Sequence, residues 1–210
     1  MAEAKKLLAE AGYPDGKGFP AMKILYNTSE AHKKIAEYIQ EQWKTNLGID
    51  VELVNEEWRT YLDTRDQGNC DIARAGWLGD YQDPNTFLDM FVTDGGGNDG
   101  KYSNPKFDEA IKAAAAMPAG PDRMAKLREA ETSFLTEDMG VMPIYFYTTN
   151  NVIDTMEWAG WHTNTMDWHP TKSIAPAGGN TKTEFVIVNG AEPQSLDPAL
   201  IEGVPEHRLY

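Results

Sequence analysis

The first part of the chain alternates between helical and strand patterns of apolar residues. Apolar side chains recur every three to four positions over 2–11 and 31–47, as on one face of a helix. The segments 22–26 and 49–53 have the short or alternating apolar pattern of strands, and 71–75 is expected to be a third strand. Strands that alternate with helices in this way are typical of an α/β layer with parallel pairing.

Capping residues mark the ends of the predicted helices. Thr28 or Ser29 can cap the long helix at its start, and Gly48 can end it. Asn55 is expected to cap the next helix, whose apolar side lies within 58–65. These signals predict a strand, helix, strand unit followed by a second helix.

The pattern changes after Trp77, where periodicity is interrupted by glycine, aspartate and proline. A short helix is expected over 87–91. The glycine- and aspartate-rich run 94–100 is expected to be a mobile loop. Two helices should follow, one over 106–117 and one that begins at Pro121.

The remainder of the chain is less regular. Residues 141–147 are predicted to form a strand, although Pro143 favours an edge position or a bulge. Residues 156–176 are predicted to form an ordered tail without a regular element, and 177–180 a flexible joint. A further strand is expected at 185–188.

Composition and charge limit the possible functions. The sequence has 33 acidic residues against 19 lysines and arginines, a formal net charge of -14, which disfavours nucleic acid and anionic membrane surfaces as partners. No apolar run approaches the roughly 20 residues that span a bilayer. Met1 leads directly into charged residues, so we expect a soluble chain without a signal peptide.

Catalytic and metal-binding patterns are absent from the sequence. The four histidines lack the spacing of metal ligands, and neither a nucleophile elbow nor a phosphate-binding glycine loop occurs. The single cysteine, Cys70, excludes an internal disulfide and is expected to be a small buried thiol. We therefore expect no metal, no cofactor and no enzymatic activity.

The stretch 73–84 is the strongest candidate for a ligand site. Arg74 lies in a predicted buried strand, and Trp77 and Asp80 follow at its carboxyl end, where open α/β sheets place ligand groups. Trp77 can form an apolar wall and Asp80 can hold a ligand's ammonium group, while Arg65 and Arg74 can bind a ligand carboxylate or neutralise Asp80. Equally well, Trp77 is a core residue, Asp80 caps the helix region around Phe87 or a turn, and Arg74 pairs locally.

Several segments also carry a family resemblance. The resemblance lies in the sequences of 26–36, 43–49, 57–65 and 77–80, and in the helix of 1–13 upstream. In these segments the chain resembles the C-terminal lobe of the oligopeptide-binding proteins of ABC importers, the family 5 extracytoplasmic solute-binding proteins. The resemblance implies an α/β fold, one lobe of a type II periplasmic-binding-protein-like architecture with a mixed sheet flanked by helices. It also implies a non-enzymatic protein that binds peptides.

The resemblance assigns roles to individual residues. It implies that Asp80 binds the α-ammonium group of a peptide, that Arg65 and Arg74 line the peptide cavity, and that Trp77 forms part of its wall. Intact members of the family work with the membrane subunits of an ABC importer, in the periplasm or anchored by lipid outside the cytoplasm.

The end of the sequence resembles the family's mature N-terminus. This similarity covers 189–198 and 201–206, so the order of segments is that of a circular permutation. By analogy, Glu202 and Val204 face the peptide. The implied domains are 1–176 as the C-terminal lobe, 177–180 as a joining linker, and 181–210 as the segment that completes the lobe.

The second lobe of the family has no counterpart in this sequence. We therefore expect the chain alone to bind peptide weakly, because a charge pair on an open half-site stays exposed to water. The alternative is an isolated or engineered scaffold lobe, without ligand function of its own, that self-associates or pairs with a complementary fragment.

Overall fold

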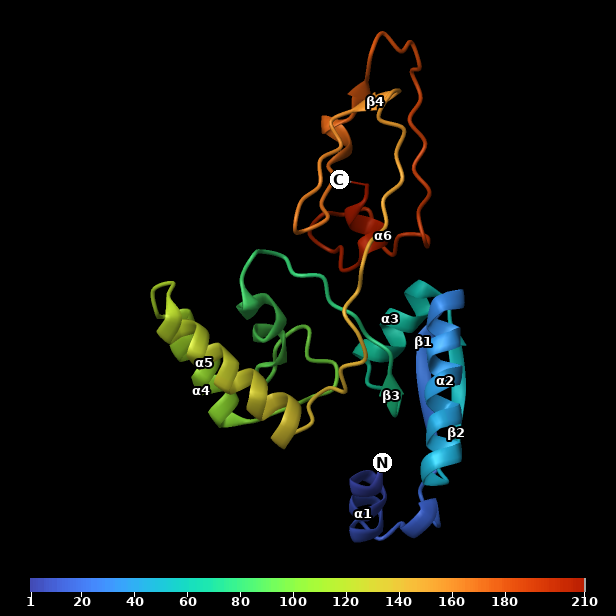
Figure 1. Cartoon of the computed structure of the whole chain (residues 1–210), viewed down its shortest axis with the longest axis vertical. Helices are drawn as coiled ribbons and strands as arrows, with labels where there is room; N and C mark the ends of the chain where they lie inside the picture. Colours follow the sequence, from blue (N-terminus) through green and yellow to red (C-terminus); the bar gives the residue numbers. More distant parts are fainter. Residues whose placement is uncertain (210) are drawn as a thin grey trace. The chain divides into compact units, whose positions relative to one another are not determined.

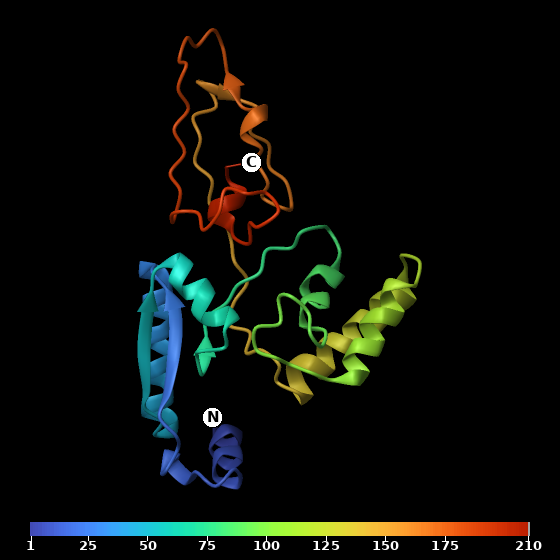
Figure 2. The same ribbon diagram turned by 180° about the vertical axis from the view of Figure 1, so that it is seen from behind.

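A computed structural model describes residues 1–209 of the chain (Figure 1). The chain divides into two compact units, Met1–Gly76 and the part from Trp77 onward. The first unit is an α/β layer. The second begins with a group of helices and continues as a C-terminal segment, residues 138–209, which can be followed from behind in Figure 2.

The first unit is built on a three-stranded parallel sheet. Its strands are β1 (Met22–Asn27), β2 (Val51–Glu56) and β3 (Ile72–Ala73), in the order β2-β1-β3. Both β2 and β3 pair with β1 in parallel, so the predicted parallel layer is confirmed. The sheet is extended by one bond beyond β3, because the main-chain N–H of Arg74 donates to the carbonyl of Leu25 at 2.8 Å.

Helices cover both faces of this sheet. Helix α2 (Glu30–Leu47) packs on the face that carries Ile24 and Val51, and α3 (Trp58–Asp66) packs on the opposite face against Leu25. This division follows from the alternation of side chains along a strand. Helix α1 (Ala2–Glu10) and the short 3₁₀ turn η1 (Pro14–Gly16) precede the sheet.

The ends of α2 agree with the capping residues expected from the sequence, whereas the start of α3 does not. Ser29 caps α2, accepting a hydrogen bond from the N–H of His32 at 3.5 Å, and Gly48 ends it with a φ of 71°. Glu57 rather than Asn55 is the N-cap of α3, so that prediction was wrong. Strand β2 runs on to Glu56 because it stays paired with β1, and this places Asn55 inside the sheet.

The second unit begins with a small helical cluster. It comprises the 3₁₀ turns η2 (Pro84–Phe87) and η3 (Asp89–Phe91), the helices α4 (Pro105–Ala115) and α5 (Pro121–Thr132), and the π turn η4 (Ser133–Glu137). The short helix expected over 87–91 is therefore replaced by two 3₁₀ turns. The core of the cluster consists of Leu88, Phe107, Ile111, Ala114, Leu127, Ala130 and Phe134.

The run 94–100, expected to be a mobile loop, is bridged by the hydrogen bonds of one buried side chain. The buried side chain of Asn98 organises it: the amide nitrogen donates to the carbonyls of Val92 at 3.1 Å and Tyr102 at 2.7 Å, and Oδ1 accepts from the N–H of Tyr102 at 2.9 Å. A single amide thus bridges the two ends of the loop. Composition alone favoured mobility because six of the seven residues are glycine or aspartate, while the burial of the seventh, Asn98, depends on folding.

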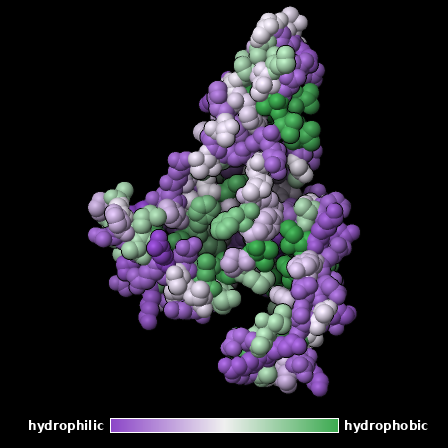
Figure 3. All heavy atoms as spheres, in the orientation of Figure 1, coloured by the Kyte–Doolittle hydropathy of each residue, from purple (hydrophilic) through white to green (hydrophobic). Residues whose placement is uncertain are grey.

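The C-terminal segment contains little regular structure. Strands β4 (Trp158–Ala159) and β5 (Ala175–Pro176) form an antiparallel pair, and η5 (Thr171–Ser173) and α6 (Val204–His207) are short helical turns. The strands predicted at 141–147 and 185–188 do not form, because no strand of the described part of the chain pairs with them. Most of their apolar side chains are exposed, and those of 186–188 appear as a hydrophobic cluster in Figure 3.

The predicted joint at 177–180 is a turn. Gly178 and Gly179 adopt left-handed conformations with φ of 58° and 80°. The side-chain amide of Asn180 donates to the carbonyl of Glu157 at 2.8 Å, as does the main-chain N–H of Ala177. The assignment of 1–176, 177–180 and 181–210 to parts of a permuted lobe stays a prediction.

Candidate functional site

Two arginines predicted to bind ligand meet at the carboxyl edge of the parallel sheet. Arg74 directly follows β3, and Arg65 lies in the last turn of α3. The buried hydroxyl of Tyr61 connects them: it accepts from Nη1 of Arg65 at 3.1 Å and donates to the main-chain carbonyl of Arg74. The guanidinium carbon of Arg65 also lies 5.4 Å from the centre of the Tyr61 ring, within cation–π range.

His32 adds a third basic side chain to this edge. It lies in the first turn of α2, just beyond the carboxyl end of β1. Burial lowers the pKa of His32 below its usual value, and the positive charge of Arg74 lowers it further, against the opposing effect of a hydrogen bond with the Asn27 backbone. In the sequence, the spacing of this histidine argued only against a metal site. Its position after β1 was the signal that could have placed it at the sheet edge.

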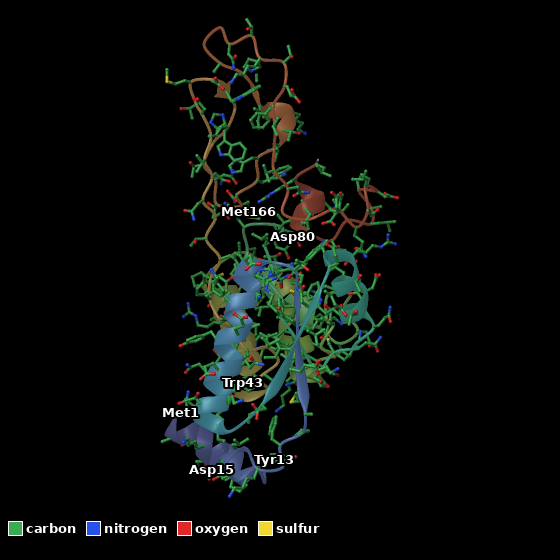
Figure 4. The ribbon with its side chains drawn as sticks, turned by 90° about the vertical axis from the view of Figure 1, so that its right-hand side faces the viewer. Met1, Tyr13, Asp15, Trp43, Asp80 and Met166 are labelled. Atoms are coloured by element: carbon green, nitrogen blue, oxygen red, sulfur yellow. The ribbon has the colours of Figure 1, made fainter. Side chains whose placement is uncertain are left out.

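Asp80 lies in the loop that opens the second unit and is labelled in Figure 4. Its main-chain N–H donates to Oγ1 of the buried Thr86 at 3.0 Å. Its side chain is exposed and has no hydrogen bond or ion pair with any of residues 1–209. The turn is capped instead by Asp83, whose Oδ1 accepts from the N–H of Asn85 at 2.9 Å. The alternative in which Asp80 serves as the cap is therefore wrong.

The residues around Asp80 are apolar, exposed and closely held. Trp77 is 41% exposed, so it is not a core residue, and Leu78, Tyr81 and Phe87 are also exposed. Gly79 leaves little room for a side chain, because a Cβ there would lie 3.0 Å from the side chains of both Thr86 and Phe87 and would require one of them to shift. The loop thus presents a carboxylate among apolar surfaces on a fixed backbone, a combination typical of ligand sites.

Glu202 and Val204 lie apart in sequence from both groups, at the start of α6. Both side chains are exposed. The fully buried Glu206 anchors this turn, since its Oε1 accepts from the main-chain N–H of Gln194 at 2.7 Å. The predicted residues therefore form three local groups: Arg65 with Arg74, Trp77 with Asp80, and Glu202 with Val204.

We also searched the structure for a ligand cavity, a metal site and a membrane-spanning helix. In the first unit a cavity of about 470 Å³ contains none of the predicted ligand residues and is lined by Lys23, Leu25, Val54, Glu56, Thr64, Gly68, Asn69, Cys70 and Asp71. Residues 1–209 contain no group of three or more histidine, cysteine or acidic side chains that could hold a metal ion. Within the same residues, no helix combines the length and the apolar character needed to cross a membrane.

Comparison with known proteins gives consistent matches. Residues 1–99 match the family described as bacterial extracellular solute-binding proteins, family 5 Middle. The periplasmic oligopeptide-binding protein OppA of Escherichia coli is 41% identical over 161 residues, which is 77% of this chain and 29% of that protein. The periplasmic murein peptide-binding protein MppA of Escherichia coli is 43% identical over 152 residues, or 72% of this chain and 28% of that protein.

Solved structures show the same likeness. A periplasmic oligopeptide-binding protein of Borrelia burgdorferi, OppAIV, matches with a TM-score of 0.78 and 40% identity, covering 83% of this chain and 35% of that one. Haemophilus influenzae OppA in complex with the peptide RPPGFSPFR matches with a TM-score of 0.65 and 42% identity, covering 70% and 28%.

The fold and these likenesses show that the chain has part of the α/β fold of periplasmic peptide-binding proteins. Within that class, the chain belongs to family 5 of the bacterial extracellular solute-binding proteins. It spans less than a third of the length of the curated relatives named above.

Proposed function

We propose that the chain is a peptide-binding part of the solute-binding component of an ABC-type oligopeptide importer, and that it is not an enzyme. The observation that carries this proposal is the Asp80 carboxylate, which is exposed and unpartnered among residues 1–209 while its main chain is held by Thr86. The names of the relatives, which are those of peptide-binding proteins, support the same function.

The proposed ligand contacts follow from charge. Asp80 accepts hydrogen bonds from the α-ammonium group of a peptide, which is a charge-assisted contact. Trp77 provides an apolar surface beside it. Arg65, whose guanidinium donates to the hydroxyl of Tyr61, and Arg74, whose main-chain carbonyl accepts from that hydroxyl, provide positive charge for ligand carboxylates.

The proposed affinity is low. An ion pair on an exposed carboxylate contributes about 0–1 kcal/mol, because water screens both charges and competes for the same hydrogen bonds. The α-ammonium group therefore improves binding by a factor of about five at most. We expect tight binding only where further protein surface excludes water from Asp80.

The proposed setting is extracytoplasmic, with the membrane subunits of the importer as partners. We further propose that 181–210 corresponds to the family's N-terminal segment in permuted order, with Glu202 and Val204 facing the peptide. The resemblance of 189–198 to that N-terminus supports this part of the proposal.

A peptide titration tests the proposed function. Chemical shifts of the labelled chain are followed while a tripeptide with a free amino terminus, or its N-acetylated form, is added. We expect the free form to bind a few-fold more tightly and Asp80→Asn to abolish the difference. Asp94→Asn is the matched control, because it removes an equal charge from the same unit, and asparagine tolerates the left-handed backbone there.

Two results would contradict the proposal. Equal binding of the two peptide forms by the unaltered chain would exclude recognition of the ammonium group by Asp80. Micromolar affinity of the isolated chain would contradict weak binding on an exposed site.

A second candidate function is self-association without a ligand. The exposed apolar side chains of the C-terminal segment favour it: Phe146 is 98% exposed, Val186 74% and Val188 83%. Light scattering without peptide tests this candidate. A larger species that Val186→Thr together with Val188→Thr converts to monomer supports it, whereas a monomeric unaltered chain excludes it.

A further inference from the structure

A bidentate ion pair joins the loop of Asp80 to helix α5. Nη1 of Arg123 donates to Oδ2 of Asp83 at 2.6 Å, and Nη2 donates to Oδ1 at 2.9 Å. The third donor, Nε, reaches the carbonyl of Ala114 in α4 at 3.0 Å. The side chains of Arg123 and Asp83 are only 13% and 28% exposed, so the planar guanidinium group is held by three hydrogen bonds in a largely buried position.

The same carboxylate orders the backbone next to Asp80. Besides the ion pair, Oδ1 of Asp83 accepts from the N–H of Asn85 at 2.9 Å, and the carbonyl of Asp83 accepts from the N–H of Thr86 at 3.2 Å. Thr86 in turn accepts from the N–H of Asp80 at 3.0 Å. A continuous series of hydrogen bonds therefore leads from Arg123 to the main chain of Asp80.

This ion pair differs from the other ion pair on the same helix. Lys126 and Glu129 meet at 3.1 Å with 38% and 72% of their side chains exposed, and they are one turn apart on α5. The Arg123 pair instead connects residues 40 positions apart. Hydrogen bonding to Arg123 is also the main cause that holds the pKa of Asp83 below its usual value.

We propose that Asp83 and Arg123 are positioning residues, which hold the loop so that Asp80 presents its carboxylate to a peptide's amino terminus. This inference rests on the proposed function, in which Asp80 is the ammonium-binding group. Neither residue is expected to touch the peptide. Loss of the pair frees the loop, and a freed loop must be ordered again when ligand binds, which weakens binding.

The experiment uses the full chain and two measurements. The first is hydrogen exchange of the Asp80 and Asn85 amides, which reports opening of the loop without any ligand. The second is the ratio of affinities for the free and the N-acetylated tripeptide. The variants are Arg123→Gln, Asp83→Asn and the conservative Arg123→Lys, and the control is Lys126→Gln, which removes the same charge from the same helix.

We expect exchange at Asp80 to accelerate on the order of tenfold in Arg123→Gln and Asp83→Asn, with the peptide ratio falling to one. Arg123→Lys should restore part of both, and Lys126→Gln should change neither. Asp83→Asn keeps the cap oxygen and leaves Arg123 on Ala114, so it separates the ion pair from folding of the helices, which circular dichroism monitors.

The outcomes distinguish this inference from the proposed function. Unchanged exchange at Asp80 in the folded Arg123→Gln and Asp83→Asn variants would overturn the positioning role. Faster exchange with an unchanged peptide ratio would overturn its importance for binding. A ratio of one in the unaltered chain would overturn the proposed function and the ligand part of this inference, while the exchange rates would still decide whether the pair holds the loop.

Discussion

The first unit and the C-terminal segment contain similar apolar segments with opposite fates. In the first unit β1 pairs with strands on both sides, and its Leu25 is only 2% exposed. In the C-terminal segment, the predicted strand at 141–147 pairs with no strand within 1–209, and Phe146 is almost fully exposed. Both segments are predominantly apolar, so apolar content alone does not account for the difference, although Pro143 removes one main-chain donor from 141–147.

The difference teaches that an apolar pattern makes a strand only where a second strand is available. The helix between β1 and β2 returns the chain so that the two strands lie parallel, and α2 and α3 then cover both faces. Side-chain packing against neighbours is the main source of strand preference, whereas the side chains of 142–147 are exposed. Its main chain is therefore left without the hydrogen bonds of a sheet.

The largest expected effect on stability comes from truncating one apolar side chain in each of the two segments. Leu25→Ala should lower the free energy of unfolding by about 2–5 kcal/mol, because it leaves a cavity between β1 and α3. Phe146→Ala should change it by less than about 0.5 kcal/mol, because that side chain is already in water. Urea denaturation followed by circular dichroism measures both. A large loss for Phe146→Ala would show that the C-terminal segment is packed in solution.

A second prediction concerns the loop 94–100, which lacks regular structure like the C-terminal segment but is bridged by a buried side chain. Asn98→Ala should lower the free energy of unfolding by about 1–3 kcal/mol, because two carbonyls and one N–H lose their partner. Hydrogen exchange at the Tyr102 amide should accelerate at the same time. Asp94→Asn in the same loop is the control and should leave both quantities unchanged. Unaltered exchange at Tyr102 in Asn98→Ala would mean that the loop is held by other contacts.

Much of the first unit could be predicted from the sequence, because its determinants are local. The period of the apolar residues defined α2, and Ser29 and Gly48 marked its ends. The parallel pairing followed from the alternation of strands and helices. Strand pairing of 141–147 and 185–188 could not be predicted, because it depends on partners distant in the chain rather than on the segments themselves.

The sequence predicted which residues belong to the candidate site, but not the contacts that hold them in place. The position of Asp80 after a strand indicated a ligand group, but a turn cap was an equal alternative until Asp83 was seen to fill that role. The connection of Arg65 and Arg74 through Tyr61 could not be predicted, because helix periodicity places Tyr61 only in the core. Likewise, Arg123 is 40 residues from Asp83, so no local pattern relates them.

The smallest expected effect concerns the basic edge of the first unit. Because burial and the charge of Arg74 lower the pKa of His32 in the folded protein, the unfolded chain binds this proton more readily. Stability from this group is therefore complete above pH 6.5, the usual pKa, and declines as the pH falls toward the folded value. Replacement of His32 by glutamine should make this part of the pH dependence disappear.

Arg74→Gln separates the two causes of that shift. Without the guanidinium charge the pKa of His32 should rise toward its usual value, but not reach it, because burial is the larger cause and remains. Arg59→Gln is the matched control, since Arg59 is exposed on α3 and is not among the causes of the shift. Titration of the His32 ring by NMR measures all three proteins. An identical pKa in Arg74→Gln would mean that the two basic groups do not meet at the sheet edge, and the proposed carboxylate-binding role of this edge would then lose its support.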